Sequence, residues 1–429
     1  MKIVEYRVTP IAFGDPPLRA ASGLHAPYAL RTIVEVAGDD GTTGVSETHG
    51  GDAVVADLEA VRDLVLGRDP LQLAALEEAI WPSSARRGDE GSKEFWAGKL
   101  GSPPRTFGAI EVACLDLAGK ALGRPVCDLL GGRVRDSVDF SAYLFYKHAG
   151  AGGSLGFGSD PSAMGWAAAR QKEALAGEAL VEQAQAMVAA FGFKSLKLKA
   201  GVLPPEEEVR TIRLLREAFG PDVPLRIDPN AAWSVETSLR LAKELEGLLE
   251  YYEDPTGGKE GMAEVAKRTS LPLATNMCTV SFTDLPESIR LGSVKIILGD
   301  HHFWGGLRAS VELARICRTW GLGLSMHSNS HLGISLAAMT HLAAAVPNLT
   351  YACDTHYPWQ AEEIIVGGKL QFEDGALTVP TAPGLGVELD HAELERMHAQ
   401  YLACGLKHRD DEIEMQKVEP GWKYVRPRW

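Results

Sequence analysis

The feature that most constrains the fold is a polar residue that recurs at the end of successive short apolar runs. After Lys199, each one follows the last at an interval of 23 to 29 residues. The series consists of Lys199, Asp228, Glu253, Asn276, Asp300 and His327. A longer stretch with helical periodicity follows each apolar run, so the repeating unit is a strand and then a helix. Polar residues at the carboxyl ends of successive parallel strands are where a (β/α) barrel holds its active site. The spacing therefore predicts such a barrel, with its chemistry on one rim.

Two lysines separated by a leucine begin the series, in residues 195–201. In a strand, Lys197 and Lys199 share one face and the flanking leucines share the other. Two ammonium groups this close, if partly buried, disfavour each other's protonation. We therefore expect a lysine with a lowered pKa, able to act as a base near neutral pH. The alternative without a catalytic role is an edge strand with two solvated lysines.

Three oxygen-bearing side chains follow on consecutive strand ends, namely Asp228, Glu253 and Asn276. Their oxygens can converge on one point, and three oxygen ligands with open positions suit Mg²⁺. Taken singly, Asp228 could begin an Asx turn and Asn276 could be a satisfied buried amide. Their common register favours a magnesium site instead.

Asp300 and His327 are predicted on neighbouring strand ends, where a carboxylate against an imidazole forms a general acid–base pair. The rival is zinc, because His327 and His331 are four residues apart and His301 and His302 adjoin Asp300. Zinc-binding histidine pairs of this spacing lie on a helix, with a glutamate between them. Here the first histidine ends a strand and no glutamate intervenes, so zinc is the lesser alternative.

Lys199 and His327 would flank a metal-bound substrate from opposite sides of the barrel. This arrangement suits removal of a proton α to a carboxylate. The metal and Lys197 would stabilise the enediolate that forms.

Three segments are predicted along the chain. Residues 1–136 carry strands and then helices, as an α+β capping domain would. Residues 137–370 hold the barrel and the catalytic residues. Residues 371–429 return to short strands, a helix and an extended tail, and we expect them to rejoin the capping domain. Residues 14–27 form a loop long enough to serve as a lid.

Composition excludes several classes of partner. The chain has 43 Lys and Arg against 57 Asp and Glu, a formal net charge of −14, which argues against nucleic acid and anionic membranes. The longest apolar run, residues 333–346, is shorter than the ~20 residues that span a bilayer. The six cysteines form no CxxC pair, and residues 1–5 lack a signal-peptide core. We therefore expect a cytoplasmic protein with reduced cysteines.

Short motifs spread over nearly the whole chain are specific enough to indicate a family. They are SGLHAP at 22–27, YLF at 143–145, KLK at 197–199, DPN at 228–230, EDP at 253–255, ATNM at 274–277, DHHFW at 300–304, HSN at 327–329, DTH at 354–356, RDD at 409–411 and PGW at 420–422. With these motifs the chain resembles the enolase superfamily (mandelate racemase/muconate lactonizing enzyme-like), and within it the glucarate dehydratase subgroup. Asn276 is telling, because most of the superfamily has a carboxylate as third metal ligand and this subgroup has Asn.

The resemblance implies a modified TIM barrel, (β/α)₇β, of the α/β class, beneath an α+β capping domain. It implies Mg²⁺ on Asp228, Glu253 and Asn276, with Lys199 and the His327–Asp300 pair as bases. Lys197 and Asn230 would lie near the substrate carboxylate. The remaining substrate contacts that it implies are His25, Tyr143, Ser328, Asn329, His356 and Arg409.

The implied reaction is the dehydration of a sugar acid in carbohydrate catabolism, by a hydro-lyase (a carbon–oxygen lyase). The α-proton leaves, the β-hydroxyl departs with a proton from His327, and the enol tautomerises to a keto-deoxy acid. A D-glucarate-like aldarate is the nominal substrate. An aldonate, a five- or six-carbon monoacid such as lyxonate, is one alternative, and acid-sugar racemisation or epimerisation is another. The chain departs from the subgroup at residues 99–107 and in the loop after Tyr143. We also expect a homo-oligomer.

Overall fold

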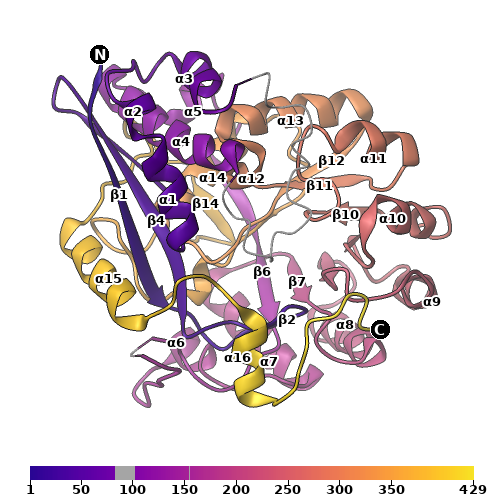
Figure 1. The fold of residues 1–429 in the computed structure, drawn as a ribbon. Coiled ribbons are helices and arrows are strands. Elements are labelled where there is room, and N and C mark those ends of the chain that lie inside the picture. The colour runs from indigo at the N-terminus through magenta and orange to yellow at the C-terminus, as the bar shows by residue number, and fades with distance from the viewer. Residues whose placement is uncertain (83–101, 154) are drawn as a thin grey trace.

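An antiparallel sheet lies beside a ring of parallel strands in the computed structural model, which describes residues 1–82, 102–153 and 155–429 (Figure 1). The antiparallel sheet has the order β1 (Ile3–Gly14), β4 (Tyr28–Gly38), β5 (Thr43–His49). Within the predicted lid loop, β2 (Arg19–Ala20) and β3 (Gly23–Leu24) form a small antiparallel pair. The helices of this part are α1 (Asp52–Ala60), α2 (Arg62–Val65), α3 (Leu73–Ile80), α4 (Pro103–Leu122) and α5 (Val126–Leu129).

The parallel strands form a nearly closed barrel, so the fold is the α/β barrel that the strand–helix spacing predicts. In chain order they are β6 (Ser137–Phe145), β7 (Leu196–Lys199), β8 (Leu225–Asp228), β9 (Tyr251–Glu253), β10 (Leu273–Thr275), β11 (Ile296–Gly299), β12 (Gly323–Met326) and β13 (Cys353–Asp354). Sequential strands are neighbours from β6 to β12, and β13 pairs with β6 on its other side. Leu196 and Leu198 are buried in the hydrophobic core, while Lys197 and Lys199 alternate with them.

Helices alternate with these strands around the outside of the barrel (Figure 1). They are α6 (Gly165–Ala169), α7 (Gly177–Phe191), α8 (Pro205–Phe219), α9 (Val235–Leu245), α10 (Gly258–Ala266), α11 (Leu285–Leu291), α12 (His301–Trp304), α13 (Leu307–Trp320) and α14 (Gly333–Ala345), with the 3₁₀ helix η1 (Tyr357–Trp359) after β13. Helix α14 is buried along its whole length. In the described part of the chain, no helix is both long and apolar enough to cross a bilayer.

The C-terminal segment first adds β14 (Ala376–Thr378) to the barrel, antiparallel to β6. Helix α15 (His391–Cys404) then packs on β1 of the antiparallel sheet, where Gln400 donates a hydrogen bond to the backbone oxygen of Ala12 (2.8 Å). Helix α16 (Asp411–Val418) lies against β3. The segment therefore contacts the barrel before it reaches the N-terminal part of the chain.

Some element boundaries differ from the sequence-based expectation. The helical pattern of the sequence predicts a helix over residues 108–122, but helix α4 begins at Pro103, because proline fits the first helical turn, where its missing N–H is not needed. The last barrel strand is the short pair Cys353–Asp354, where the apolar pattern predicts residues 349–353. Of the segment 99–107, residues 99–101 lie outside the described residues.

Candidate active site

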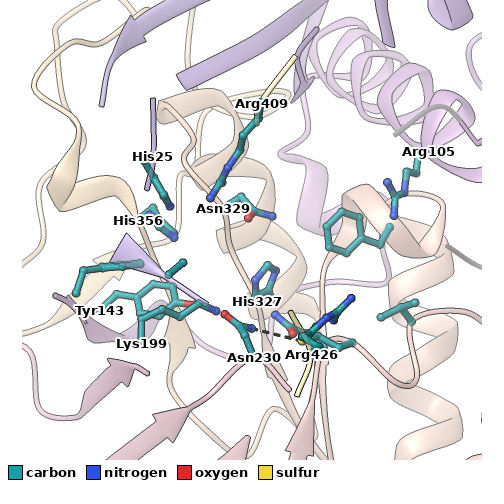
Figure 2. A pocket seen from close by; sticks show the side chains of 16 residues that line it. His25, Arg105, Tyr143, Lys199, Asn230, His327, Asn329, His356, Arg409 and Arg426 are labelled. Carbon is teal, nitrogen blue, oxygen red and sulfur yellow. Dashed lines mark hydrogen bonds between the residues drawn. The ribbon is translucent and has the colours of Figure 1, made fainter. Parts of the chain in front are cut away.

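The ends of neighbouring barrel strands bring the predicted polar residues together at one rim. Strands β7 and β8 pair in parallel with Lys199 opposite Asp228, and β9 pairs with β10 with Glu253 opposite Ala274. Asn276 follows β10 directly. Figure 2 shows Lys199, Asn230 and His327 around one pocket. The sequence series thus becomes a set of side chains that face one another across the barrel mouth.

The loops after β8 and β9 hold strained backbone. Asn230 (φ 50°), Ala231 (φ 59°) and Asp254 (φ 33°) lie in the left-handed region, which costs of order 1–3 kcal/mol for a residue other than glycine. The Ala231 N–H donates a hydrogen bond to the backbone oxygen of Asp254 (2.7 Å) and ties the two loops together. This strain is located where the predicted metal ligands end their strands.

Two buried oxygens at the ends of β9 and β10 lack a hydrogen-bond donor, and they suit a cation. Oε1 of Glu253 and Oδ1 of Asn276 accept no hydrogen bond from the described residues, and Oε2 of Glu253 faces the ammonium group of Lys197. Asp228 and Glu253 also form, with Asp254, a buried group whose carboxylate oxygens lie within 4.8 Å of one another. Asp254 is already engaged, because its oxygens accept from Thr275 Oγ1 (2.5 Å) and from the Asn276 N–H (2.9 Å). Asp228, Glu253 and Asn276 therefore fit Mg²⁺ best.

The electrostatics of the two carboxylates support this assignment. Burial raises the pKa of Glu253 well above its usual range, and the charge of Asp228 adds to the effect. Two buried carboxylates this close disfavour each other's ionised form unless a cation lies between them. Lys197 supplies part of that charge, since its Nζ lies 2.5 Å from Glu253 Oε2 and 2.6 Å from Asp354 Oδ2.

The expectation of a lysine with a lowered pKa is wrong for this arrangement. Burial alone lowers the pKa of Lys199, but the carboxylate of Asp228 outweighs it and leaves the pKa raised. Lys199 Nζ donates a hydrogen bond to Asp228 Oδ2. The pKa of Lys197 is raised as well, because Asp354 and Glu253 together outweigh its burial. The error arose because the sequence pattern showed the two like charges but not the carboxylates that face them.

The predicted acid–base pair is formed across β11 and β12. Asp300 Oδ2 lies 3.1 Å from Nδ1 of His327, and both side chains are buried. Burial lowers the pKa of His327 despite the nearby carboxylate. The pKa of Asp300 lies well below its usual range, because His302 and His327 outweigh its burial. A neutral His327 therefore donates through Nδ1, and its Nε2 carries the lone pair that can take a proton.

Zinc is not favoured by this geometry. His331 does not join His327, because its Nδ1 lies 3.1 Å from the backbone oxygen of Leu332 and its Nε2 lies 3.3 Å from Thr355 Oγ1. Asp300, His301 and His302 do form a buried cluster that could hold a metal. Within that cluster, however, both ring nitrogens of His302 already lie within 3.1 Å of protein partners.

Most of the residues predicted to contact substrate line one pocket with the bases. The pocket is lined by His25, Tyr143, Lys199, Asn230, Asn276, His327, Asn329, His356 and Arg409 (Figure 2). Lys197, Asp228, Glu253 and Asp300 lie behind this lining. Ser328 is not part of it either, because its Oγ accepts a hydrogen bond from the His356 N–H (3.0 Å). Ser328 therefore holds the loop that carries His356.

The guanidinium of Arg409 is less available to bind a substrate carboxylate than the sequence suggested. Its guanidinium donates to both oxygens of Asp411, at 2.6 and 2.7 Å, and Asp411 also accepts from Ser22 Oγ. Close by, Nδ1 of His25 lies 2.8 Å from Asp15. Arg409 still lines the pocket, but part of its charge is balanced by a carboxylate.

Two further arginines line the pocket that sequence reasoning missed, Arg105 and Arg426. Arg105 lies over the ring of Phe303, 4.6 Å from its centroid. Arg426 is brought in by the C-terminal tail, because the Arg428 N–H donates to Ala232 O (2.7 Å) in the loop after β8. The tail has no strand-end pattern, so the sequence held no signal that Arg426 would reach the barrel mouth.

Comparison with known proteins decides the family. A family model described as enolase C-terminal domain-like matches residues 179–393, half of the chain. A curated protein of Streptomyces coelicolor, named probable glucarate dehydratase, is 46% identical over 100% of this chain and 99% of its own length. The chain belongs to the enolase superfamily. Its dehydratase relatives place it among the hydro-lyases, as the motifs imply.

Solved structures agree with this family. An enolase from Mycobacterium smegmatis complexed with tartrate is 50% identical, with a TM-score of 0.90 over 100% of this chain and 98% of the other. Another from Pseudomonas fluorescens, with bound magnesium, potassium and tartrate, is 49% identical, with a TM-score of 0.90 over 100% and 99%. The P. fluorescens relative binds magnesium, and this superfamily member has a buried acidic group that could hold a metal.

Proposed function

We propose that this enolase-superfamily enzyme is a magnesium-dependent dehydratase of a sugar acid, with a six-carbon aldarate of the D-glucarate type as its substrate. The observation that carries the proposal is the pocket shared by Lys199, His327 and Asn276, with the buried carboxylate of Glu253 behind it. Two groups able to move a proton thus flank a position beside a cation site. That is what removal of a proton α to a carboxylate requires.

Asp228, Glu253 and Asn276 would hold the cation. Bound there, Mg²⁺ would supply positive charge for the carboxylate oxygens that become more negative when the α-proton leaves. Lys197, fully buried against Glu253 and Asp354, adds a fixed positive charge to the same region. Lys199 now shares its proton with Asp228, so a cation on Asp228 would compete for that oxygen and lower the pKa of Lys199.

The proton transfers fall to His327 and Lys199. One of them takes the proton from the carbon next to the carboxylate, and the base used depends on which face of that carbon bears it. The hydroxyl on the adjacent carbon then leaves with a proton from His327, so one water is lost overall. A neutral His327 can perform both steps for one epimer, because the proton that it takes is the proton that it returns. The resulting enol tautomerises to a keto-deoxy acid.

The charge of the pocket supports a diacid. Arg105, Arg409 and Arg426 line it together with Lys199, although the chain as a whole is acidic. A guanidinium binds a carboxylate through two parallel hydrogen bonds, so these arginines suit the distal carboxylate of an aldarate. The bound tartrate of the relatives from M. smegmatis and P. fluorescens is also a hydroxylated diacid.

An aldonate is the second candidate, and the Arg409–Asp411 pair favours it. A guanidinium already balanced by a carboxylate can donate to hydroxyl groups without needing a second anion. The test is to assay five- and six-carbon aldarates and aldonates side by side, with detection of the keto-acid product. Turnover of aldarates supports the proposal, and turnover of aldonates alone contradicts the diacid. Epimerised acid without keto acid would contradict dehydration and indicate an epimerase.

A further inference from the structure

Asp300 is held by two histidines, of which the proposed mechanism uses one. Its Oδ2 lies 3.1 Å from Nδ1 of His327, and its Oδ1 lies 2.8 Å from Nδ1 of His302. The backbone N–H of His302 also donates to Oδ1 (3.0 Å), which caps helix α12. We propose that His302 is a positioning residue that fixes the plane of the Asp300 carboxylate, and through it the ring of His327.

The direction of the hydrogen bonds supports this role. The pKa of Asp300 lies well below its usual range, so the carboxylate is ionised and both histidines donate to it through Nδ1–H. The other nitrogen of His302, Nε2, lies 3.1 Å from Nη2 of Arg31. Arg31, His302, Asp300 and His327 therefore form one continuous series of polar contacts, in which Nδ1–H of each histidine points to the Asp300 carboxylate.

The Arg31 end of this series of polar contacts belongs to the antiparallel sheet and not to the barrel. Arg31 lies on β4, and its Nε donates to Glu47 of β5 (2.9 Å). Its Nη2 also donates to Ser335 Oγ (3.0 Å). The backbone oxygen of Glu47 and Ser335 Oγ lie 3.1 Å from His302 Nε2, so the imidazole is enclosed on this side.

Glu47 makes this end rigid. Its side chain is fully buried, and its two oxygens accept from the N–H groups of Leu332 (2.9 Å) and Ser335 (3.0 Å) at the start of α14. A carboxylate at a helix N-terminus is stabilised by the helix dipole as well as by these bonds. Glu47 of the antiparallel sheet and Ser335 of helix α14 thus both contact His302 at Nε2. Loss of such supporting partners typically lowers activity 10- to 100-fold where the supported group is a metal ligand, and we expect a similar range here.

Two substitutions distinguish the roles of the two ring nitrogens of His302. In His302→Asn the side-chain amide occupies the place of Nδ1 and can still donate to Asp300. In His302→Gln the longer side chain places its amide near Nε2 and leaves Asp300 without this donor. The inference rests on the proposed dehydration, so wild-type keto-acid formation from a sugar acid is measured first. We expect His302→Gln to lower kcat about 10- to 100-fold with KM little changed, and His302→Asn to retain most of kcat.

A second readout separates positioning from a general loss of structure. Exchange of the substrate α-proton with solvent deuterium is followed for the epimer that faces His327 and for the one that faces Lys199. In His302→Gln we expect exchange on the His327 side to fall with kcat, while exchange on the Lys199 side persists. His341→Gln is the matched control, because His341 is also buried with two hydrogen bonds, to the Cys127 N–H and Leu385 O, but lies outside the pocket.

The outcomes are distinct. Equal loss of both exchange reactions in His302→Gln, or equal kcat in His302→Gln and wild type, overturns the positioning role. Loss of activity in His341→Gln as large as in His302→Gln overturns it as well, because any buried histidine would then have the same effect. Absence of keto acid with every sugar acid in the wild-type enzyme contradicts the proposed function instead.

Discussion

Lys199 donates a hydrogen bond through Nζ to Oδ2 of Asp228, so the predicted base is bonded directly to one of the predicted magnesium ligands. A cation bound to Asp228 would compete with Lys199 for the charge of this carboxylate. Metal occupancy and the protonation of Lys199 are therefore linked, because binding of the cation makes the lysine easier to deprotonate.

Removal of the metal is expected to abolish turnover. Dialysis against a chelator should leave an inactive protein. Added Mg²⁺ should restore activity, since Asp228, Glu253 and Asn276 would then hold the ion again. Glu253→Gln should weaken Mg²⁺ binding by at least about 100-fold in a calorimetric titration. Glu250→Gln is the control, because Glu250 pairs with Arg226 just before β9 and away from the predicted ligands. Full activity of the chelated enzyme would contradict the metal assignment.

Substitution of the tail arginine is expected to change substrate preference. Arg426→Met should lower kcat/KM for aldarates about 10-fold, because a partly exposed ion pair contributes up to about 1 kcal/mol and a charged hydrogen bond adds to it. Aldonates should be affected much less. Arg428→Met serves as control, since Arg428 lies in the same tail but over the Trp422 ring, 4.4 Å from its centroid. An equal effect of Arg426→Met on both substrate classes would exclude a contact with the distal carboxylate.

Acid is expected to destabilise the fold through a buried histidine outside the pocket. Burial lowers the pKa of His341 from 6.5 to about 4, while its Nδ1 accepts from the Cys127 N–H. Between these values the unfolded chain binds more protons, so the free energy of unfolding should fall as pH drops from about 6.5 to about 4 and level off below. The contribution is at most roughly 3 kcal/mol.

Denaturant unfolding at several pH values measures this contribution. His341→Gln should flatten the pH dependence of the free energy of unfolding between about 6.5 and about 4, relative to the wild type. Substitution of the exposed His391 by Gln is the control and should leave that dependence as in the wild type. An unchanged slope in His341→Gln would show that this histidine is not the source.

The barrel and the strand-end residues could be predicted from the sequence because both follow from a local period. Each of Asp228, Glu253 and His327 closes or directly follows its own apolar run, and parallel strands bring such ends to one rim without further information. The resemblance then supplied contacts outside this series, such as His25 in the N-terminal part of the chain and Tyr143 on β6.

What the sequence could not show depends on contacts between distant segments. The raised pKa of Lys199 results from Asp228, 29 residues away along the chain and adjacent only in the sheet. Arg426 reaches the pocket because the tail is bonded to the loop after β8. The contact of Arg31 with His302 spans 271 residues between two parts of the fold. In each case the partner is set by tertiary structure, and a pattern along the chain does not contain it.

The most direct test of the account is His327→Asn assayed for two reactions at once. Keto-acid formation should fall by at least about 10³-fold, because His327 is the group proposed to protonate the departing hydroxyl. Exchange of the α-proton with solvent deuterium should persist for the one epimer whose proton faces Lys199. A His327→Asn enzyme that folds normally and still forms keto acid at a near wild-type rate would contradict the central role given to the His327–Asp300 pair.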